Sequence, residues 1–135
     1  MWCYPSSTMK VTFFPVKTTS AKLTKITNLA VDYFQRSEPI LFFVQDEAAW
    51  DFLDNLFWST PAESFLPHPT KLIQIRTTFD MTCPTIFNLS SAPLVHESIK
   101  TLYELEDHTT PDRLKASQNR YHTYRSQDVQ IIVEE

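Results

Sequence analysis

The segment from Pro111 to Arg125 concentrates residue types that bind anions. It holds four bases and a single acid, Asp112, in a chain whose formal net charge is −4. The bases are Arg113, Lys115, Arg120 and Arg125, and Tyr121 and Tyr124 lie among them. A guanidinium or ammonium group pairs with a carboxylate, while a tyrosine ring packs against an apolar side chain. The segment therefore indicates a site for an acidic peptide or a phosphate backbone, unless it is an ordinary solvated helix whose tyrosines face the core.

Large aromatic side chains are concentrated between Asp46 and His68. The first part of this stretch has apolar residues at i, i+3, i+4 and i+7, a spacing that predicts a helix with one buried stripe. The stripe consists of Ala49, Phe52, Leu53 and Leu56. One amphipathic helix cannot hide the remaining aromatic residues of the stretch against a single core. The helix is therefore either covered on two sides or ends in an exposed aromatic patch.

Five residues outside that stripe fall into two groups, one interpreted as core and one as surface. We interpret Trp50 and Phe57 as core residues, because aromatic residues within a helical pattern most often pack inside. Trp58, Phe65 and Pro67 stand at the predicted helix end and in a proline-containing loop, and loops run over protein surfaces. Exposed aromatic patches usually mark partner surfaces. We therefore predict that these last three residues contact a protein partner.

Side chains that support catalysis or hold a metal do not converge in the sequence. No two of the four histidines stand at i, i+4 beside an acid, a convergence that a zinc site would need. No Ser-His-Asp or Cys-His set can be identified. Glu104, Glu106 and Asp107 come at the end of a predicted strand, and we interpret them as a charged edge rather than a catalytic pair. We therefore expect no enzyme activity, no metal and no cofactor.

Glycine is absent from all 135 residues, which argues against nucleotide chemistry. Loops that cradle phosphates need glycine, because their backbone visits positive φ and closely approaches the pyrophosphate. A degenerate nucleotide-binding or hydrolytic α/β enzyme is therefore the alternative function rather than the leading one. Direct binding of nucleic acid through the basic segment is a third hypothesis, and the net charge of −4 argues against it.

The chain has the length of one domain and lacks the sequence features of export or membrane insertion. Its start has neither the charged nor the apolar region of a signal peptide, and no apolar run reaches the roughly 18 residues of a spanning helix. Cys3 and Cys83 give neither a disulfide framework nor metal-ligand spacing. We expect a reduced, cytoplasmic protein without membrane contact, with residues 1–8 as a flexible leader and residues 9–135 as the domain.

The predicted elements alternate between strands and helices. Strands are expected at residues 10–16, 40–44, 71–76, 85–89, 100–106 and 129–133, and helices at residues 21–36, about 46–58, 93–97 and 111–126. Thr18, Thr19 and Ser20 offer caps for the first helix, and Thr110 caps the last helix with Pro111 in its first turn. Such alternation is typical of a parallel sheet with helices on its faces.

Several blocks of the chain, spread over residues 9 to about 127, match a known family. The strongest is Leu53-Asp54-Asn55-Leu56-Phe57-Trp58 followed by Pro61-Ala62-Glu63-Ser64-Phe65-Leu66-Pro67-His68. Weaker blocks are Lys10–Phe14, Val44–Glu47, Ile86–Ser90 and Arg120–Arg125. In these blocks the chain resembles the chi subunit of bacterial DNA polymerase III, an accessory protein of the clamp loader.

The resemblance implies a non-catalytic adaptor with a single Rossmann-like α/β domain, a mainly parallel sheet and helices on both faces. Chi-like proteins bind the acidic C-terminal tail of single-stranded DNA-binding protein (SSB), so they reach DNA only indirectly. They also bind the psi subunit of the clamp loader, and a helicase-like repair protein can compete for that surface. In the family this surface holds a tryptophan and a Phe-x-Pro loop, which match Trp58, Phe65 and Pro67.

The SSB-tail site of the family lies along the last helix. Its early lysine matches Lys115 and its later tyrosine matches Tyr121. The family's arginine one turn before the tyrosine is Gln118 here, and Arg125, one turn after Tyr121 on the same face, is expected to take its place. The resemblance therefore implies a tail site made of Lys115, Gln118, Tyr121 and Arg125, with no cofactor.

Overall fold

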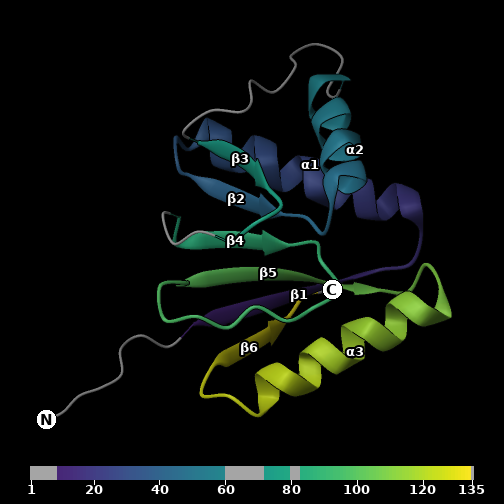
Figure 1. The fold of residues 1–135 in the computed structure, drawn as a ribbon, viewed down its shortest axis with the longest axis vertical. Coiled ribbons are helices and arrows are strands. Elements are labelled where there is room, and N and C mark those ends of the chain that lie inside the picture. Colours follow the sequence, from purple (N-terminus) through teal and green to yellow (C-terminus); the bar gives the residue numbers. More distant parts are fainter. Residues whose placement is uncertain (1–8, 60–71, 80–82, 135) are drawn as a thin grey trace, which may run out of the picture.

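A computed structural model describes residues 9–59, 72–79 and 83–134, which form a six-stranded sheet between two layers of helices (Figure 1). In chain order the elements are β1 (Lys10–Val16), α1 (Thr19–Gln35), β2 (Ile40–Phe43), α2 (Glu47–Ser59), β3 (Ile73–Arg76), β4 (Thr85–Asn88), β5 (Thr101–Asp107), α3 (Pro111–Arg125) and β6 (Gln130–Val133). The strand order is β3-β2-β4-β5-β1-β6, and every pairing between these strands is parallel. The predicted Rossmann-like α/β domain with a mainly parallel sheet is confirmed. The predicted leader, residues 1–8, lies outside the described residues.

Two apolar cores lie on the two faces of the sheet. Phe13 and Phe14 are neighbours in β1 and point to opposite faces, as successive strand residues do. Phe14 belongs to the core that α1 and α2 cover. Phe13 lies on the α3 side, where its ring packs edge-to-face on Tyr121 and Tyr124 at centroid distances of 5.5 and 6.0 Å. The expectation of helices on both faces is therefore confirmed.

The helix starts agree with the predicted caps. Thr18 Oγ1 accepts a hydrogen bond from the backbone N–H of Ala21 at 3.0 Å, which opens α1. Thr110 Oγ1 accepts one from the backbone N–H of Arg113 at 3.1 Å, which opens α3. Each bond satisfies one of the N–H groups that a helix start leaves without an internal partner. The first turn of α3 thereby has a fixed direction relative to the end of β5.

The end of α1 uses a left-handed residue although the chain has no glycine. Ser37 has a φ of 56°. Its N–H donates to the carbonyl of Phe34 at 3.1 Å, and the N–H of Glu38 donates to the carbonyl of Tyr33 at 2.9 Å. This pair of bonds is the Schellman motif, in which glycine is usual because it has no Cβ to clash. The motif closes α1 just before the chain enters β2.

The buried face of α2 differs from the predicted stripe. Phe52 was expected inside, but it is 55% exposed, so that prediction was wrong. Leu53 and Phe57 are the buried residues instead, because α2 packs on β2 with the Phe57 ring 5.2 Å from the ring of Phe42. Trp50 is partly buried beside them, and its Nε1–H donates to the carbonyl of Ile75 at 3.0 Å. The four-residue spacing of Leu53 and Phe57 therefore marks the core side of this helix.

The short helix predicted at residues 93–97 was wrong. Residues 93–96 have no regular secondary structure, and a turn follows at residues 97–98. The backbone N–H of Leu94 donates to the hydroxyl of Tyr124 at 3.0 Å, so this group is satisfied without a helix. Leu94 and Ile99 pack into the core on the α3 side of the sheet. This loop therefore covers part of the same face of the sheet as α3.

Candidate functional site

A small pocket of about 190 Å³ lies between α3 and the strands that it covers. Its walls are Phe13, Glu106, Ser117, Gln118, Tyr121, His122 and Val133. Two of the four predicted tail-site residues, Gln118 and Tyr121, thus share one pocket. A third, Arg125, has its guanidinium carbon 5.9 Å from the centroid of the Tyr121 ring. Lys115 is exposed on α3 but does not line the pocket, so the structure brings three of the four together.

Aromatic contacts build the apolar floor of this pocket. The half-buried ring of Tyr121 rests edge-to-face on Phe13, which is itself buried in β1. Val133 adds an exposed aliphatic side chain from β6, in register with Phe13. Gln118 and His122 are exposed and form a polar rim. An apolar floor with a polar rim suits one apolar side chain carried on a polar backbone.

Glu106 adds a negative charge to the wall of the pocket. Its Oε2 lies 2.9 Å from His108 Nε2. The predicted charged strand edge includes Glu106, and Glu106 lies on the α3 side of β5 because it follows Glu104 at the two-residue spacing of a strand. A carboxylate that enters the pocket is repelled by Glu106. Such a group is therefore best placed against α3, where Arg125 opposes the repulsion.

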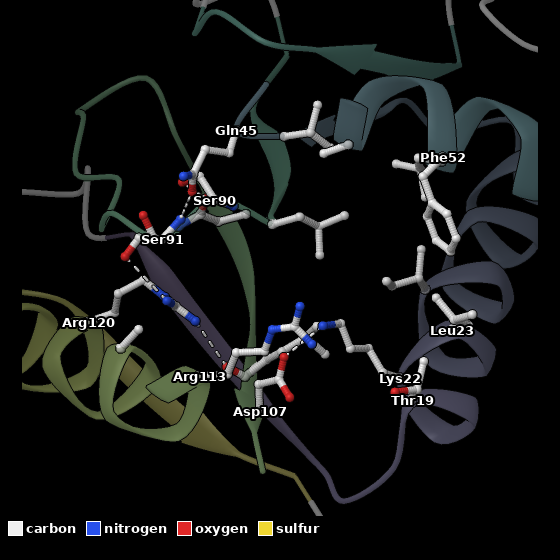
Figure 2. Close-up of a pocket in the computed structure, with 18 residues that line it drawn as sticks. Thr19, Lys22, Leu23, Gln45, Phe52, Ser90, Ser91, Asp107, Arg113 and Arg120 are labelled. Carbon is white, nitrogen blue, oxygen red and sulfur yellow. Dashed lines mark hydrogen bonds and ion pairs between the residues drawn. The ribbon is translucent and has the colours of Figure 1, made fainter. Parts of the chain in front are cut away.

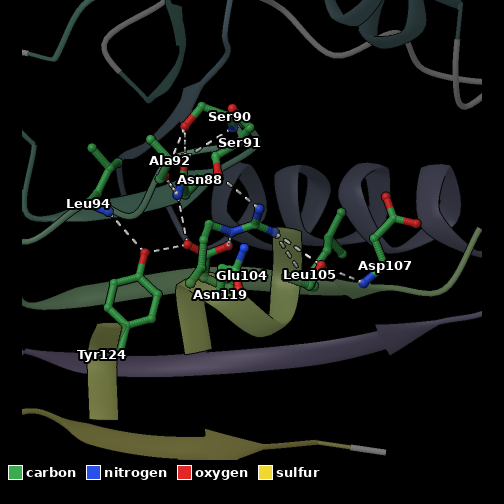
Figure 3. A network of polar contacts seen from close by, with 12 residues as sticks. Asn88, Ser90, Ser91, Ala92, Leu94, Glu104, Leu105, Asp107, Asn119 and Tyr124 are labelled. Carbon is green, nitrogen blue, oxygen red and sulfur yellow. Dashed lines mark hydrogen bonds and ion pairs between the residues drawn. The ribbon is translucent and has the colours of Figure 1, made fainter. Parts of the chain in front are cut away.

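Glu104 of β5 and Arg120 of α3 form a buried ion pair. Figure 3 shows the polar network around Glu104. Glu104 is fully buried, Arg120 is 6% exposed, and Arg120 Nε lies 2.9 Å from Glu104 Oε1. Two interpretations were therefore wrong: Arg120 is not part of the basic surface of the helix, and Glu104 is not at a charged edge. Arg120 faces the sheet because Ser117 and Tyr124, the other buried residues of α3, lie on the same side at i−3 and i+4.

This ion pair is the centre of a network that joins three elements. Asn88 Nδ2 of β4 donates to Glu104 Oε2 at 2.7 Å, and the Tyr124 hydroxyl of α3 donates to the same oxygen. In the part of the chain that the structure describes, no buried side-chain nitrogen or oxygen lacks a hydrogen-bond partner. The network fixes the rotation of α3 about its own axis. It thereby holds Tyr121 at the pocket, because Tyr121 follows Arg120 directly.

The protonation of Glu104 depends on this network. Burial raises the pKa of Glu104, while the charge of Arg120 and the hydrogen bonds from Tyr124 and Asn88 act in the opposite direction. Burial and the neighbouring Glu104 carboxylate also raise the pKa of Tyr124. Loss of any cationic or donor partner would therefore favour protonation of Glu104. Glu104 has no contact with solvent, and its pairing with Arg120 links β5 to α3.

One aromatic side chain is exposed at the end of α2. Trp58 is 46% exposed there, whereas its neighbour Phe57 is fully buried. The expectation that Phe57 belongs to the core is confirmed, and the exposure of Trp58 agrees with its predicted place on the surface. Phe65 and Pro67 lie outside the described residues, so their part in this surface stays a prediction.

A larger cleft of about 590 Å³ lies at the carboxyl ends of β2, β4 and β5 (Figure 2). Inside it, Lys22 Nζ and Asp107 Oδ2 lie 2.7 Å apart. Burial raises the pKa of Asp107, but the hydrogen bonds from Lys22 and Thr109 outweigh burial and hold that pKa below its usual value. No group of three or more metal-ligating side chains occurs in residues 9–59, 72–79 and 83–134.

Comparison with known proteins assigns the family. Residues 9–132 match the family described as DNA polymerase III chi subunit, HolC. This chain belongs to the chi subunit family. The resemblance seen in the sequence is therefore confirmed. Members of the chi family are non-catalytic accessory subunits of the polymerase. A search of curated proteins gave no match.

Sequence reasoning about this chi protein missed three walls of the α3 pocket. Phe13, Glu106 and Val133 come from β1, β5 and β6, which are far apart in the chain but adjacent in the sheet. Alternation along each strand could have assigned these residues to one face, but only the strand order brings them together.

Among the helices of the described residues, none combines the length and the apolar character needed to cross a bilayer.

Proposed function

We propose that this chi family member is a non-catalytic adaptor that works in the cytoplasm. One surface, around Tyr121 on α3, binds the acidic C-terminal tail of SSB. A second surface, around Trp58 on α2, binds a psi-like subunit of the clamp loader or a repair helicase. The adaptor thereby connects SSB-coated DNA to the polymerase III machinery and touches the DNA only through SSB.

The pocket beside Tyr121 is the observation that carries the proposal for the tail. Its floor of Phe13, Tyr121 and Val133 offers an apolar contact for the terminal side chain of the tail. Arg125, against the Tyr121 ring, offers a cation for the terminal carboxylate, and Gln118 offers an amide donor. The chemistry of the pocket thus matches a chain end that is both apolar and anionic.

The charges around the pocket set the expected strength of binding. Lys115 is exposed three residues before Gln118, so it can attract acidic residues that precede the end of the tail. Glu106 opposes them from the strand side. A disordered tail must also lose conformational entropy when it binds. Binding should therefore be of modest affinity and should weaken as salt is added.

The position of Trp58 supports a separate partner surface. Trp58 lies on α2, and α2 and α3 cover opposite faces of the sheet. A half-exposed tryptophan is a typical energetic anchor of a protein interface. Because the two surfaces lie on different helices and different faces, occupation of one leaves room for a partner on the other.

A titration with a fluorescently labelled peptide that carries the SSB tail tests the first surface. Tyr121→Ala is expected to weaken binding at least about tenfold, because the peptide loses its apolar contact. Lys115→Ala is expected to weaken it only a few-fold and to make the salt dependence shallower, as expected for an exposed charge.

Arg36→Ala is the matched control for lost positive charge, because Arg36 is exposed at the end of α1. It should bind the peptide as the wild type does. No binding by the wild type, or equal binding by Tyr121→Ala and the wild type, would exclude this pocket as the tail site.

A further inference from the structure

The cleft of about 590 Å³ at the carboxyl edge of the sheet has no role in the adaptor function. Neither Tyr121 nor Trp58 lines it. It lies outside the ends of β2, β4 and β5 and is bordered by residues of α1, α2 and α3 (Figure 2). In α/β folds with parallel sheets, this edge is where small ligands bind. Its volume of about 590 Å³ also falls in the usual range for such sites.

One wall of the cleft is apolar. It is formed by Leu23 and Ile26 of α1 and by Ala49, Phe52 and Leu53 of α2. Phe52 is 55% exposed at this wall, although a phenylalanine in a helix usually packs inside. An aromatic side chain held at the mouth of a cavity can cover the apolar part of a bound molecule. This wall therefore favours a ligand with an aromatic or branched aliphatic body.

The opposite wall is polar and carries one positive charge in excess. Lys22 and Asp107 neutralise each other at 2.7 Å. Arg120 also reaches this wall, where it donates to the Ser91 carbonyl at 3.3 Å, but its charge is neutralised by the buried Glu104. These two pairs therefore add no net charge to the cleft.

Arg113 supplies the excess charge. It is exposed in the first turn of α3, and no acid within ion-pair distance of it is found in the described residues. The contact made by its guanidinium is a hydrogen bond of 3.4 Å from Nη1 to Thr109 Oγ1. Figure 2 shows Arg113 beside Lys22 and Asp107, inside the cleft. The start of α3, to which Arg113 belongs, adds the positive end of a helix dipole.

We propose that this cleft binds a small organic monoanion, with its carboxylate or sulfonate group on Arg113 and its apolar body against Phe52. A single excess positive charge matches a monoanion and leaves a nucleoside di- or triphosphate largely uncompensated. The chain also lacks the glycine-rich turn that such phosphates need. The bound molecule would occupy a site separate from both partner surfaces.

Fluorescence of 8-anilinonaphthalene-1-sulfonate, an aromatic monosulfonate, tests this proposal on the full chain at low salt. The wild type should show saturable enhancement with one site per chain. Arg113→Gln should weaken probe binding at least about tenfold, because the charge-assisted hydrogen bond is lost. Phe52→Ser should also weaken it, and Phe52→Trp should restore it.

Two variants separate the cleft from general binding of the probe. Arg36→Gln removes an exposed charge at the end of α1 outside the cleft, and Val95→Ser removes an exposed apolar group outside it; both should bind the probe as the wild type does. Phenylacetate should displace the probe from the wild type, and the SSB-tail peptide should not. Equal binding by wild type, Arg113→Gln and Phe52→Ser would overturn the proposal. Displacement by the tail peptide would also overturn it, since the cleft would then be a peptide site.

Discussion

Replacing Arg120 by methionine is expected to lower the free energy of unfolding by about 3–5 kcal/mol. Arg120 is 6% exposed and its Nε lies 2.9 Å from Oε1 of the fully buried Glu104. Methionine keeps most of the volume but leaves Glu104 without a cation in a place that water does not reach. Removing one partner of a buried pair is costly for this reason, whereas removing both is often neutral. Urea denaturation at pH 7, followed by circular dichroism, measures the loss.

The loss should depend on pH with a defined sign. Without Arg120 the main opposing charge is gone, so burial raises the pKa of Glu104 further above its value in the unfolded chain. A group with a raised native pKa loses its stabilising contribution as pH rises through that pKa. The difference between wild type and Arg120→Met should therefore be smaller at pH 5 than at pH 8.

Two further variants complete this test. Arg120→Met combined with Glu104→Leu should recover much of the lost stability, because no buried charge remains. Arg36→Met removes an exposed arginine that pairs with Asp32 and Glu38, and it should leave the stability close to that of the wild type. A loss below 1 kcal/mol for Arg120→Met, with no change between pH 5 and pH 8, would contradict the role given to the pair.

Phe57→Ala is expected to destabilise the fold by about 3–5 kcal/mol, whereas Trp58→Ala should cost about 1 kcal/mol or less. Phe57 is fully buried, with its ring 5.2 Å from the ring of Phe42, so truncation leaves a cavity in the core under α2. Trp58 is 46% exposed, so truncation removes less buried surface. Thermal or urea denaturation of the two variants measures the contrast between neighbouring positions of one helix.

This contrast decides how Trp58 is understood. If Trp58→Ala unfolds the protein or costs as much as Phe57→Ala, Trp58 is a core residue and its assignment to a partner surface is wrong. If Trp58→Ala stays folded, any loss of partner binding in that variant can be attributed to the surface itself.

The order of strands and helices could be predicted from the sequence because local signals mark it. The apolar run from Ile40 to Val44 has the continuous pattern of a strand buried on both faces. Thr18, Thr110 and Pro111 mark helix starts by hydrogen bonding and by fixed backbone geometry. Such signals depend on neighbours in the chain. They can therefore be detected in a single sequence. The strand order depends on pairings between distant residues and cannot be detected in this way.

The errors arose where distant contacts decide the environment of a residue. Phe52 fits the helical stripe of α2 as well as Leu53 does, and only the position of α2 on β2 shows that Phe52 faces the cleft. Glu104 and Arg120 look like surface charges, because nothing local shows that β5 and α3 bring them together. The strand β5 places Leu102, Glu104 and Glu106 on one face. The apolar Leu102 among them is a weak sign in the sequence that this face is not simply exposed to solvent.

The candidate site was predicted only in part for the same reason. Gln118, Tyr121 and Arg125 lie on one side of α3, and helical spacing could group them. Lys115 is positively charged, as the tail site requires, but it lies outside the pocket. The resemblance alone could not show this position. The floor under Tyr121 comes from strands whose register no local pattern specifies.

The central claim is that one small domain joins an SSB tail to a second protein through two separate surfaces. Co-capture tests it most directly: an immobilised SSB-tail peptide is incubated with this chain and a purified psi subunit or helicase. The account predicts that the wild type carries the second protein onto the peptide, that Trp58→Ala binds the peptide but carries nothing, and that Tyr121→Ala is not captured. The account would be contradicted if Trp58→Ala captured the second protein as strongly as the wild type does. It would also be contradicted if the wild type saturated the peptide but captured no second protein.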